Sequence, residues 1–145
     1  MEPIRVKKLK ENAILPVYGS AEAAGADLYA CLDAPVLVEP GETAWIPTGI
    51  ALEVPKGCAG LVYARSSLGA KRGLAPANKV GVIDSDYRGE IRVVLLNHSK
   101  ATQVIEPGER VAQFLITPVL TPPYVESEEL SDTSRGVGGF GSTGK

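Results

Sequence analysis

Histidine and cysteine are scarce in this chain of 145 residues, which contains one His and two Cys. The lone His98 and the separated Cys31 and Cys58 argue against a zinc site, because such sites need clustered nitrogen and sulfur ligands. The sequence leaves one disulfide open, but two reduced thiols in a cytoplasmic protein are the expectation without a recognisable signal peptide. A metal, if used, would be held by carboxylates, water or a substrate phosphate, and Mg²⁺ suits those ligands.

Long apolar runs and an excess of positive charge are also missing. No run approaches the roughly 18 apolar residues of a membrane-spanning helix, and the N-terminal stretch MEPIRVKKLKENA has no apolar signal-peptide core. The net charge of -2 argues against a general polyanion binder, although a few Arg side chains can still line a pocket for a small anion. We therefore expect neither a membrane nor a nucleic acid as a partner.

What the sequence does contain is a series of short β-like runs, in a length that fits one domain. The separators are turn signals, and EPGE occurs twice, where Pro followed by Gly suits a type II turn. Many short strands with Gly/Pro turns predict an all-β barrel or sandwich. The runs lie at 4–9, 45–54, 58–64, 90–97 and 111–119.

The run at 90–97 places Ile91, Val93 and Leu95 on one face and mostly apolar residues on the other. This pattern predicts a strand buried largely on both sides.

Two further segments complete the predicted organisation. The stretch SSLGAKRG at 66–73 is the one helix candidate, with Ser66 or Ser67 as its N-cap. From Thr121 onward the chain has few core residues and ends in RGVGGFGSTGK. We predict a barrel domain over 1–120 and a C-terminal arm over 121–145 with a mobile tip.

The stretch ARSSLGAKRG is the first that could carry chemistry. Arg65, Ser66 and Ser67 lie where a strand gives way to the predicted helix, and an Arg fork with two hydroxyls suits an anion. Taken alone, the stretch is better interpreted as a helix cap beside a surface Arg, because Ser caps are common.

The stretch NKVGVIDSDYRGEI predicts a β-hairpin with an acidic tip. Asp84 follows apolar residues, which suggests partial burial and a general-base role. The alternative is a polar turn, and for Asp86 we favour that turn.

Two further stretches carry polar residues between apolar ones. Arg110 and Gln113 interrupt a strand in ERVAQFL and need partners if buried. Asp27 in AGADLYA is either a turn-capping carboxylate or a contact to metal-bound water.

Five motifs together resemble the trimeric dUTP pyrophosphatases (dUTPases), in order and over nearly the whole chain. Ala64 is one departure, because the family commonly has Pro before the Arg. The motifs are AGADLYA at 24–30, ARSSLG at 64–69, NKVGVIDSDYRGEI at 78–91, RVAQ at 110–113 and RGVGGFGSTG at 135–144.

The resemblance implies hydrolysis of dUTP to dUMP and pyrophosphate, with Mg²⁺ held by the triphosphate and waters rather than by the protein. It implies a distorted antiparallel β-barrel of jelly-roll (β-clip) type with one short helix and a flexible C-terminal arm. It also implies a homotrimer whose active sites each draw on more than one chain.

The resemblance also implies roles for individual residues of the barrel. Asp84 would deprotonate the water that attacks the α-phosphorus, and Tyr87 would pack under the deoxyribose. Asp27 and Arg110 would support the site, and Arg92 would line it. The phosphate oxygens would be held by Arg65, Ser66, Ser67 and Gln113, and the uracil edge would be read by Asn78 and the backbone of Val82, Ile83 and Asp84.

For the Gly-rich tail the resemblance implies a closing segment. Phe140 would stack on uracil, Arg135 would neutralise the γ-phosphate, and Gly141, Ser142 and Thr143 would complete the substrate contacts. Composition alone favours a disordered end for the same residues.

Three rival functions stay open from the sequence. A dCTP deaminase of the same superfamily would need a Glu at the position of Val94, and Glu90 belongs to the YRGE turn. A non-catalytic regulatory nucleotide-binding module is the second rival. A nucleic-acid binder using Arg65, Lys71 and Arg72 is the third, and the charge balance speaks against it.

Overall fold

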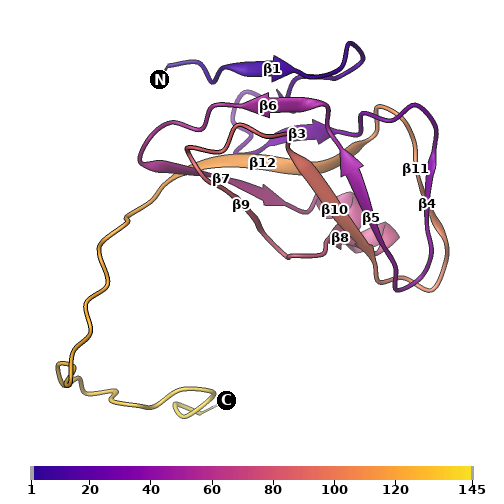
Figure 1. Cartoon of the computed structure of the whole chain (residues 1–145). Coiled ribbons are helices and arrows are strands. Elements are labelled where there is room, and N and C mark those ends of the chain that lie inside the picture. The colour runs from indigo at the N-terminus through magenta and orange to yellow at the C-terminus, as the bar shows by residue number, and fades with distance from the viewer. Residues whose placement is uncertain (1, 145) are drawn as a thin grey trace.

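The computed structural model describes residues 2–144 and contains short strands with one short helix, as Figure 1 shows. The all-β prediction is thereby confirmed. The strands are β1 (Val6–Lys8), β2 (Val17–Tyr18), β3 (Ala26–Tyr29), β4 (Val36–Val38), β5 (Thr43–Pro47), β6 (Ile50–Leu52), β7 (Cys58–Tyr63), β8 (Leu74–Pro76), β9 (Gly81–Ile83), β10 (Arg92–Asn97), β11 (Gln103–Ile105) and β12 (Arg110–Pro118).

The strands form four antiparallel sheets around one apolar core. The largest sheet has the order β2-β3-β12-β7-β9, and β5-β10-β8 form a second. Strands β1 and β6 pair with each other, and so do β4 and β11. The long strand β12 runs between β3 and β7, so the motifs at 24–30 and 110–113 lie on neighbouring strands and the motif at 64–69 follows directly from β7.

Strand β10 shows how the alternating pattern builds the core. Val93 and Leu95 are buried and continue the apolar face of Ile91, while Arg92 on the other face is exposed and Val94 is half-buried. The prediction of burial on both faces is therefore wrong, because β10 belongs to a sheet with one covered face.

The predicted hairpin at 78–91 is also wrong in its pairing. Strand β9 pairs with β7, whereas β10 pairs with β5 and β8. The two strands that flank the acidic tip thus belong to different sheets. The antiparallel pair that encloses residues 78–91 is β8 with β10.

The helix η1 (Leu68–Arg72) is a single π-type turn near the predicted position. Ser67 is the N-cap residue, as predicted, but its hydroxyl makes no capping hydrogen bond and instead accepts one from Arg65 Nη1 at 3.3 Å. Gly73 ends the helix with φ +65°, and a Cβ there would lie 2.9 Å from the Ser99 backbone nitrogen. Glycine is therefore required at this turn.

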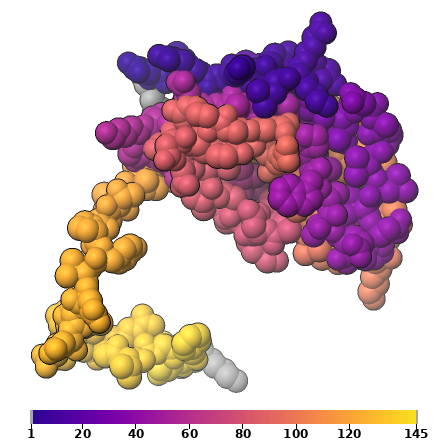
Figure 2. All heavy atoms as spheres, viewed as in Figure 1, coloured from indigo at the N-terminus to yellow at the C-terminus, as the bar shows by residue number. Residues whose placement is uncertain are grey.

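Beyond β12 the chain leaves the body as an extended arm, which Figures 1 and 2 show projecting from the sheets. Residues 118–137 are all exposed, and within the described range no strand follows Pro118. The division at residue 120 stays a prediction. In the part of the chain that is described, no helix is long and apolar enough to cross a membrane.

Candidate active site

A cationic cleft of about 300 Å³ lies where η1 meets the start of β12. It contains four cationic side chains and one carboxylate, so an anion is the ligand that its charge favours. The lining residues are Arg65, Ser67, Leu68, Lys71, Arg72, Glu109 and Arg110.

Asp27 on β3 joins two of the cationic side chains behind this cleft. Its Oδ1 accepts from Arg65 Nε at 2.8 Å, and its Oδ2 lies 3.4 Å from Arg110 Nη1. The Asp27 side chain is only 14% exposed, which limits screening of both ion pairs. Asp27 thus holds two guanidinium groups at one place, and its supporting role in the site stays a prediction.

Gln113 lies behind the strand end that carries Arg65. Its Nε2 donates to the Ala64 carbonyl at 2.8 Å, and a Cβ on Gly25 would meet its Oε1 at 2.6 Å. The amide is thus enclosed by β3 and β7, and one of its two donors is already used. The structure brings Arg65, Ser67 and Arg110 to the cleft, whereas Gln113 supports the backbone beneath them and Ser66 is exposed beside it.

A second, smaller pocket of about 100 Å³ lies between β9 and β10. It brings together four predicted residues, Asn78, Val82, Ile83 and Arg92. Strand β9 is the edge strand of its sheet, so its outer backbone donors and acceptors are not used by a neighbouring strand. The pocket therefore offers free peptide groups beside apolar walls. The remaining lining residues are Val62, Pro76, Gly81, Val93 and Val94.

The acidic tip lies next to this pocket, and its Tyr87 is held in place. Tyr87 Oη donates to the Glu90 carbonyl at 2.9 Å, and a Cβ on Gly89 would lie 2.3 Å from Oη. Only glycine at 89 leaves room for the ring, a requirement that the sequence analysis missed. Asp84 is exposed in the single chain, so its predicted partial burial is wrong for this chain alone.

The position that would separate a deaminase from a dUTPase is Val94, and Val94 lines the small pocket. The nearby Glu90 carboxylate accepts from Gly49 N and from Arg92 Nε, both at 2.9 Å. Glu90 is therefore engaged with neighbouring groups, and a Val side chain cannot transfer protons.

The predicted residues of the tail are not brought to either hollow. Phe140 is fully exposed with φ +51°, and Arg135 Nε donates to Gly138 O at 2.7 Å within the tail itself. Gly141, Ser142 and Thr143 are likewise exposed in the arm.

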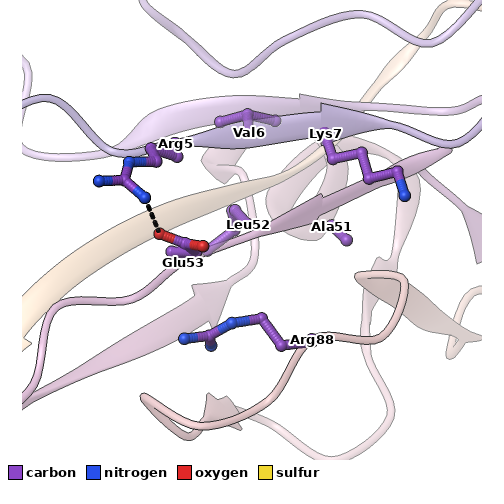
Figure 3. A pocket seen from close by; sticks show the side chains of 7 residues that line it. All are labelled: Arg5, Val6, Lys7, Ala51, Leu52, Glu53 and Arg88. Atoms are coloured by element: carbon purple, nitrogen blue, oxygen red, sulfur yellow. Dashed lines mark ion pairs between the residues drawn. The ribbon is translucent and has the colours of Figure 1, made fainter.

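A third hollow, of about 290 Å³, lies beside β1 and β6 and contains none of the predicted site residues. Figure 3 shows Arg5 reaching Glu53, with Nη1 and Oε2 3.5 Å apart, and Arg88 on the facing loop. Arg88 Nη1 donates to the Ser85 carbonyl at 2.8 Å, so it closes the acidic tip.

Within residues 2–144, no group of three or more His, Cys, Asp or Glu side chains is placed to hold a metal ion. Asp27 is engaged by two Arg, which leaves the exposed carboxylates of the acidic tip, Asp84 and Asp86, beside Ile83 of the small pocket. This donor set suits a hard cation that keeps most of its ligands as water or substrate oxygen.

Sequence and structure comparisons agree on the family. The dUTPase family profile matches residues 11–144. Deoxyuridine 5'-triphosphate nucleotidohydrolase from Hydrogenobaculum sp. is 50% identical over 139 residues, covering 96% of both chains.

Solved structures give the same result for the fold. A Staphylococcus bacteriophage 80alpha dUTPase mutant with dUpNHpp superposes with a TM-score of 0.91 at 29% identity, covering 100% of both chains. A dUTPase from phage phi11 of S. aureus, whose structure describes the coordination of a structural Mg(II) ion, has a TM-score of 0.81 at 27% identity, covering 90% of this chain and 100% of that one. The jelly-roll prediction agrees with these neighbours, and the chain belongs to the dUTPase family.

Proposed function

We propose that this chain hydrolyses dUTP to dUMP and pyrophosphate. Its membership of the dUTPase family supports the reaction, and a solved relative carries dUpNHpp. The observation that carries the proposal is the unpaired edge of β9 beside a small apolar pocket, in a chain that also has a separate cationic cleft. A uracil base and a triphosphate are the two ends of one ligand that such a pair of hollows would accept.

The uracil end is assigned to the pocket between β9 and β10. The backbone of Val82, Ile83 and Asp84 and the amide of Asn78 would pair with the polar edge of the base. The apolar walls would exclude the 5-methyl group of thymine, and Tyr87 would pack under the sugar where a 2′-hydroxyl would clash. Arg92 lines this pocket and would contact the nucleotide from β10.

The phosphate end is assigned to Arg65, Ser66 and Ser67, with Arg110 and Asp27 as supports and Gln113 as a contact from β12. Arg forks bind phosphate oxygens in a defined orientation, which positions the α-phosphorus for attack. The arm would add Arg135 at the γ-phosphate and Phe140 on the base, with Gly141, Ser142 and Thr143 closing around the nucleotide. Closure would exclude bulk water from the site.

Asp84 is the proposed general base. It would accept a proton from a water molecule as the water oxygen bonds to the α-phosphorus and the bond from that phosphorus to the bridging oxygen breaks. Pyrophosphate leaves with that bridging oxygen, and dUMP keeps the new oxygen. The chain's own contribution is positioning and charge neutralisation, as in other phosphoryl transfers.

Magnesium fits this donor set as an ion carried by the triphosphate and waters. When bound, it would neutralise charge on the phosphate oxygens. Asp84 is the carboxylate that would hold a water ligand of this ion, since Asp27 is engaged by Arg65 and Arg110.

The two hollows share no lining residue, so we propose that subunits of a homotrimer complete each other's sites. The cell would use the reaction to limit uracil in DNA and to supply dUMP for dTMP synthesis.

The test is pyrophosphate release from dUTP, dCTP, dTTP and UTP in the presence of Mg²⁺. We expect dUTP to be the strongly preferred substrate. Ammonia release from dCTP at a comparable rate would establish a deaminase instead, and binding of dUTP without turnover would establish a regulatory module.

A further inference from the structure

Arg72, the last residue of η1, contacts three separate groups on β11 and on the turn that follows it. Nε donates to Gln103 Oε1 at 3.2 Å, Nη2 donates to the Val104 carbonyl, and Nη1 is paired with Glu109 Oε1. An arginine fork can satisfy these acceptors at once, whereas a lysine ammonium is a single point charge. Arg72 therefore ties the end of the helix to β11 and to the turn that precedes β12.

The Glu109 carboxylate contacts both Arg72 and the backbone of that turn. Its Oε2 accepts from the backbone nitrogen of Glu106 at 2.9 Å, which closes the second EPGE turn. The next residue is Arg110, which Asp27 holds together with Arg65.

These contacts form a closed ring around the cationic cleft. From Arg72 the ring passes to Glu109, along the backbone to Arg110, through Asp27 to Arg65, and back along η1. The helix is thus held at both ends against the same point of β12. A ring of this kind restricts how far the hydroxyl of Ser67 can move from the guanidinium groups.

We propose that Arg72 and Glu109 are positioning residues for the phosphate cleft, an inference that rests on the proposed function of that cleft. Their contact sets the spacing between the Arg65–Ser67 segment and Arg110, so that both sides meet one triphosphate. Neither residue needs to touch the substrate. The pair is partly buried, with side chains 30% and 21% exposed, so solvent screens it less than it screens a surface pair.

The chain offers a matched control in the Arg5–Glu53 pair beside β1. It joins the same residue types, but its side chains are 85% and 46% exposed and it lies outside the cleft. Comparing Arg72→Met with Arg5→Met therefore separates loss of positioning from loss of an ion pair in general.

The experiment measures kcat and KM for dUTP in the full-length Arg72→Met, Glu109→Gln, double and Arg5→Met variants. We expect Arg72→Met and Glu109→Gln each to lower kcat by roughly 10- to 100-fold, because small misplacements of reacting groups carry large costs. The double variant should lose no more than the worse single variant, since both act through one contact. Arg5→Met should keep its kcat within about twofold of the unchanged protein, the effect expected of a change outside the site.

Hydrogen exchange of residues 64–73 and 109–113 supplies a readout independent of activity. Exchange should rise in both segments in Arg72→Met and in neither in Arg5→Met. If the unchanged protein fails to hydrolyse dUTP, the proposed function is wrong and exchange alone decides the positioning claim. Any of three results would overturn the positioning claim. These are unchanged exchange in Arg72→Met, a kcat of the single variants within threefold of the unchanged protein, and additive losses in the double variant.

Discussion

The cationic cleft and the C-terminal arm carry the same chemical groups but differ in how the fold holds them. Each has an arginine and a pair of neighbouring hydroxyl residues. Arg65 directly precedes Ser66 and Ser67 in the cleft, and Arg135 lies seven residues before Ser142 and Thr143 in the arm. Arg65 is 20% exposed and fixed by Asp27, whereas Arg135 donates only to a carbonyl three residues away.

One half of the proposed site is therefore formed by folding, and the other half must be formed by binding. Fixed groups lose little entropy when the ligand arrives, whereas an exposed arm must be ordered at a cost. The arm gains in return a way to admit the nucleotide and then exclude water. Changes in the arm should therefore alter activity alone, and changes in the cleft should also alter stability.

Removing residues 135–145 should give the largest effect. We expect dUTP hydrolysis to fall by at least about 1,000-fold, because an arginine supplied to a transferring phosphoryl group is worth that much or more. The melting temperature should not change, since residues 135–137 and the Phe140 side chain are exposed and bury no core. Both are measured on the truncated protein, hydrolysis by pyrophosphate-release kinetics and the melting temperature by calorimetry. Normal hydrolysis would show that the arm is only a disordered end.

Asp84→Asn should come next. Turnover should fall by at least about 100-fold, the low end of what a positioned base supplies, while nucleotide affinity is kept. Asp86→Asn is the matched control two residues along the same loop and should retain normal turnover. Equal losses in both variants would mean that the acidic tip as a whole, and not the Asp84 carboxylate, matters.

Asp27→Asn tests the cationic cleft, the part of the proposed site that is formed by folding. It weakens the partnership with both Arg65 and Arg110, so we expect a loss of about 2 kcal/mol in the free energy of unfolding and about a tenfold loss of activity from misplaced phosphate contacts. Denaturant unfolding of this variant and of Asp33→Asn, whose ion pair is on the surface, measures the difference. If Asp27→Asn lowers activity but leaves the free energy of unfolding unchanged, Asp27 does not stabilise the preformed cleft.

The smallest effect is expected at Tyr87. Tyr87→Ala should raise UTP cleavage relative to dUTP by a few fold, because the ring would no longer block the 2′-hydroxyl. Gly89→Ala should act in the same direction, since its Cβ would displace the Tyr87 ring. An unchanged UTP to dUTP ratio in both variants would remove Tyr87 from sugar selection.

Much of the fold follows from local patterns in the sequence. Alternating apolar residues at 91–95 and the two EPGE turns are short-range signals, and they predict strands and turns well. The pairing of β9 with β7 rather than with β10 depends on contacts distant in sequence, which no local pattern carries. The missing side-chain cap at Ser67 has a local origin instead, because Arg65, two residues earlier, donates to the Ser67 hydroxyl.

The candidate site could likewise be predicted only in part from the sequence. The motifs predict which residue types gather, and Arg65, Ser67 and Arg110 do line one cleft. Arg72, Glu109 and Gly89 were missed because their roles come from a three-way fork, a shared carboxylate and a steric contact between neighbouring residues. The second EPGE turn is the one sequence signal that pointed toward Glu109.

The most direct test of the account is hydrogen exchange in the arm of the full-length protein with and without dUpNHpp and Mg²⁺. If binding orders the arm, residues 135–144 should exchange rapidly in the free protein and become strongly protected when the analogue binds. The protection of β12 should hardly change. Exchange in the arm that stays equally fast with the analogue bound would contradict the claim that binding completes the site.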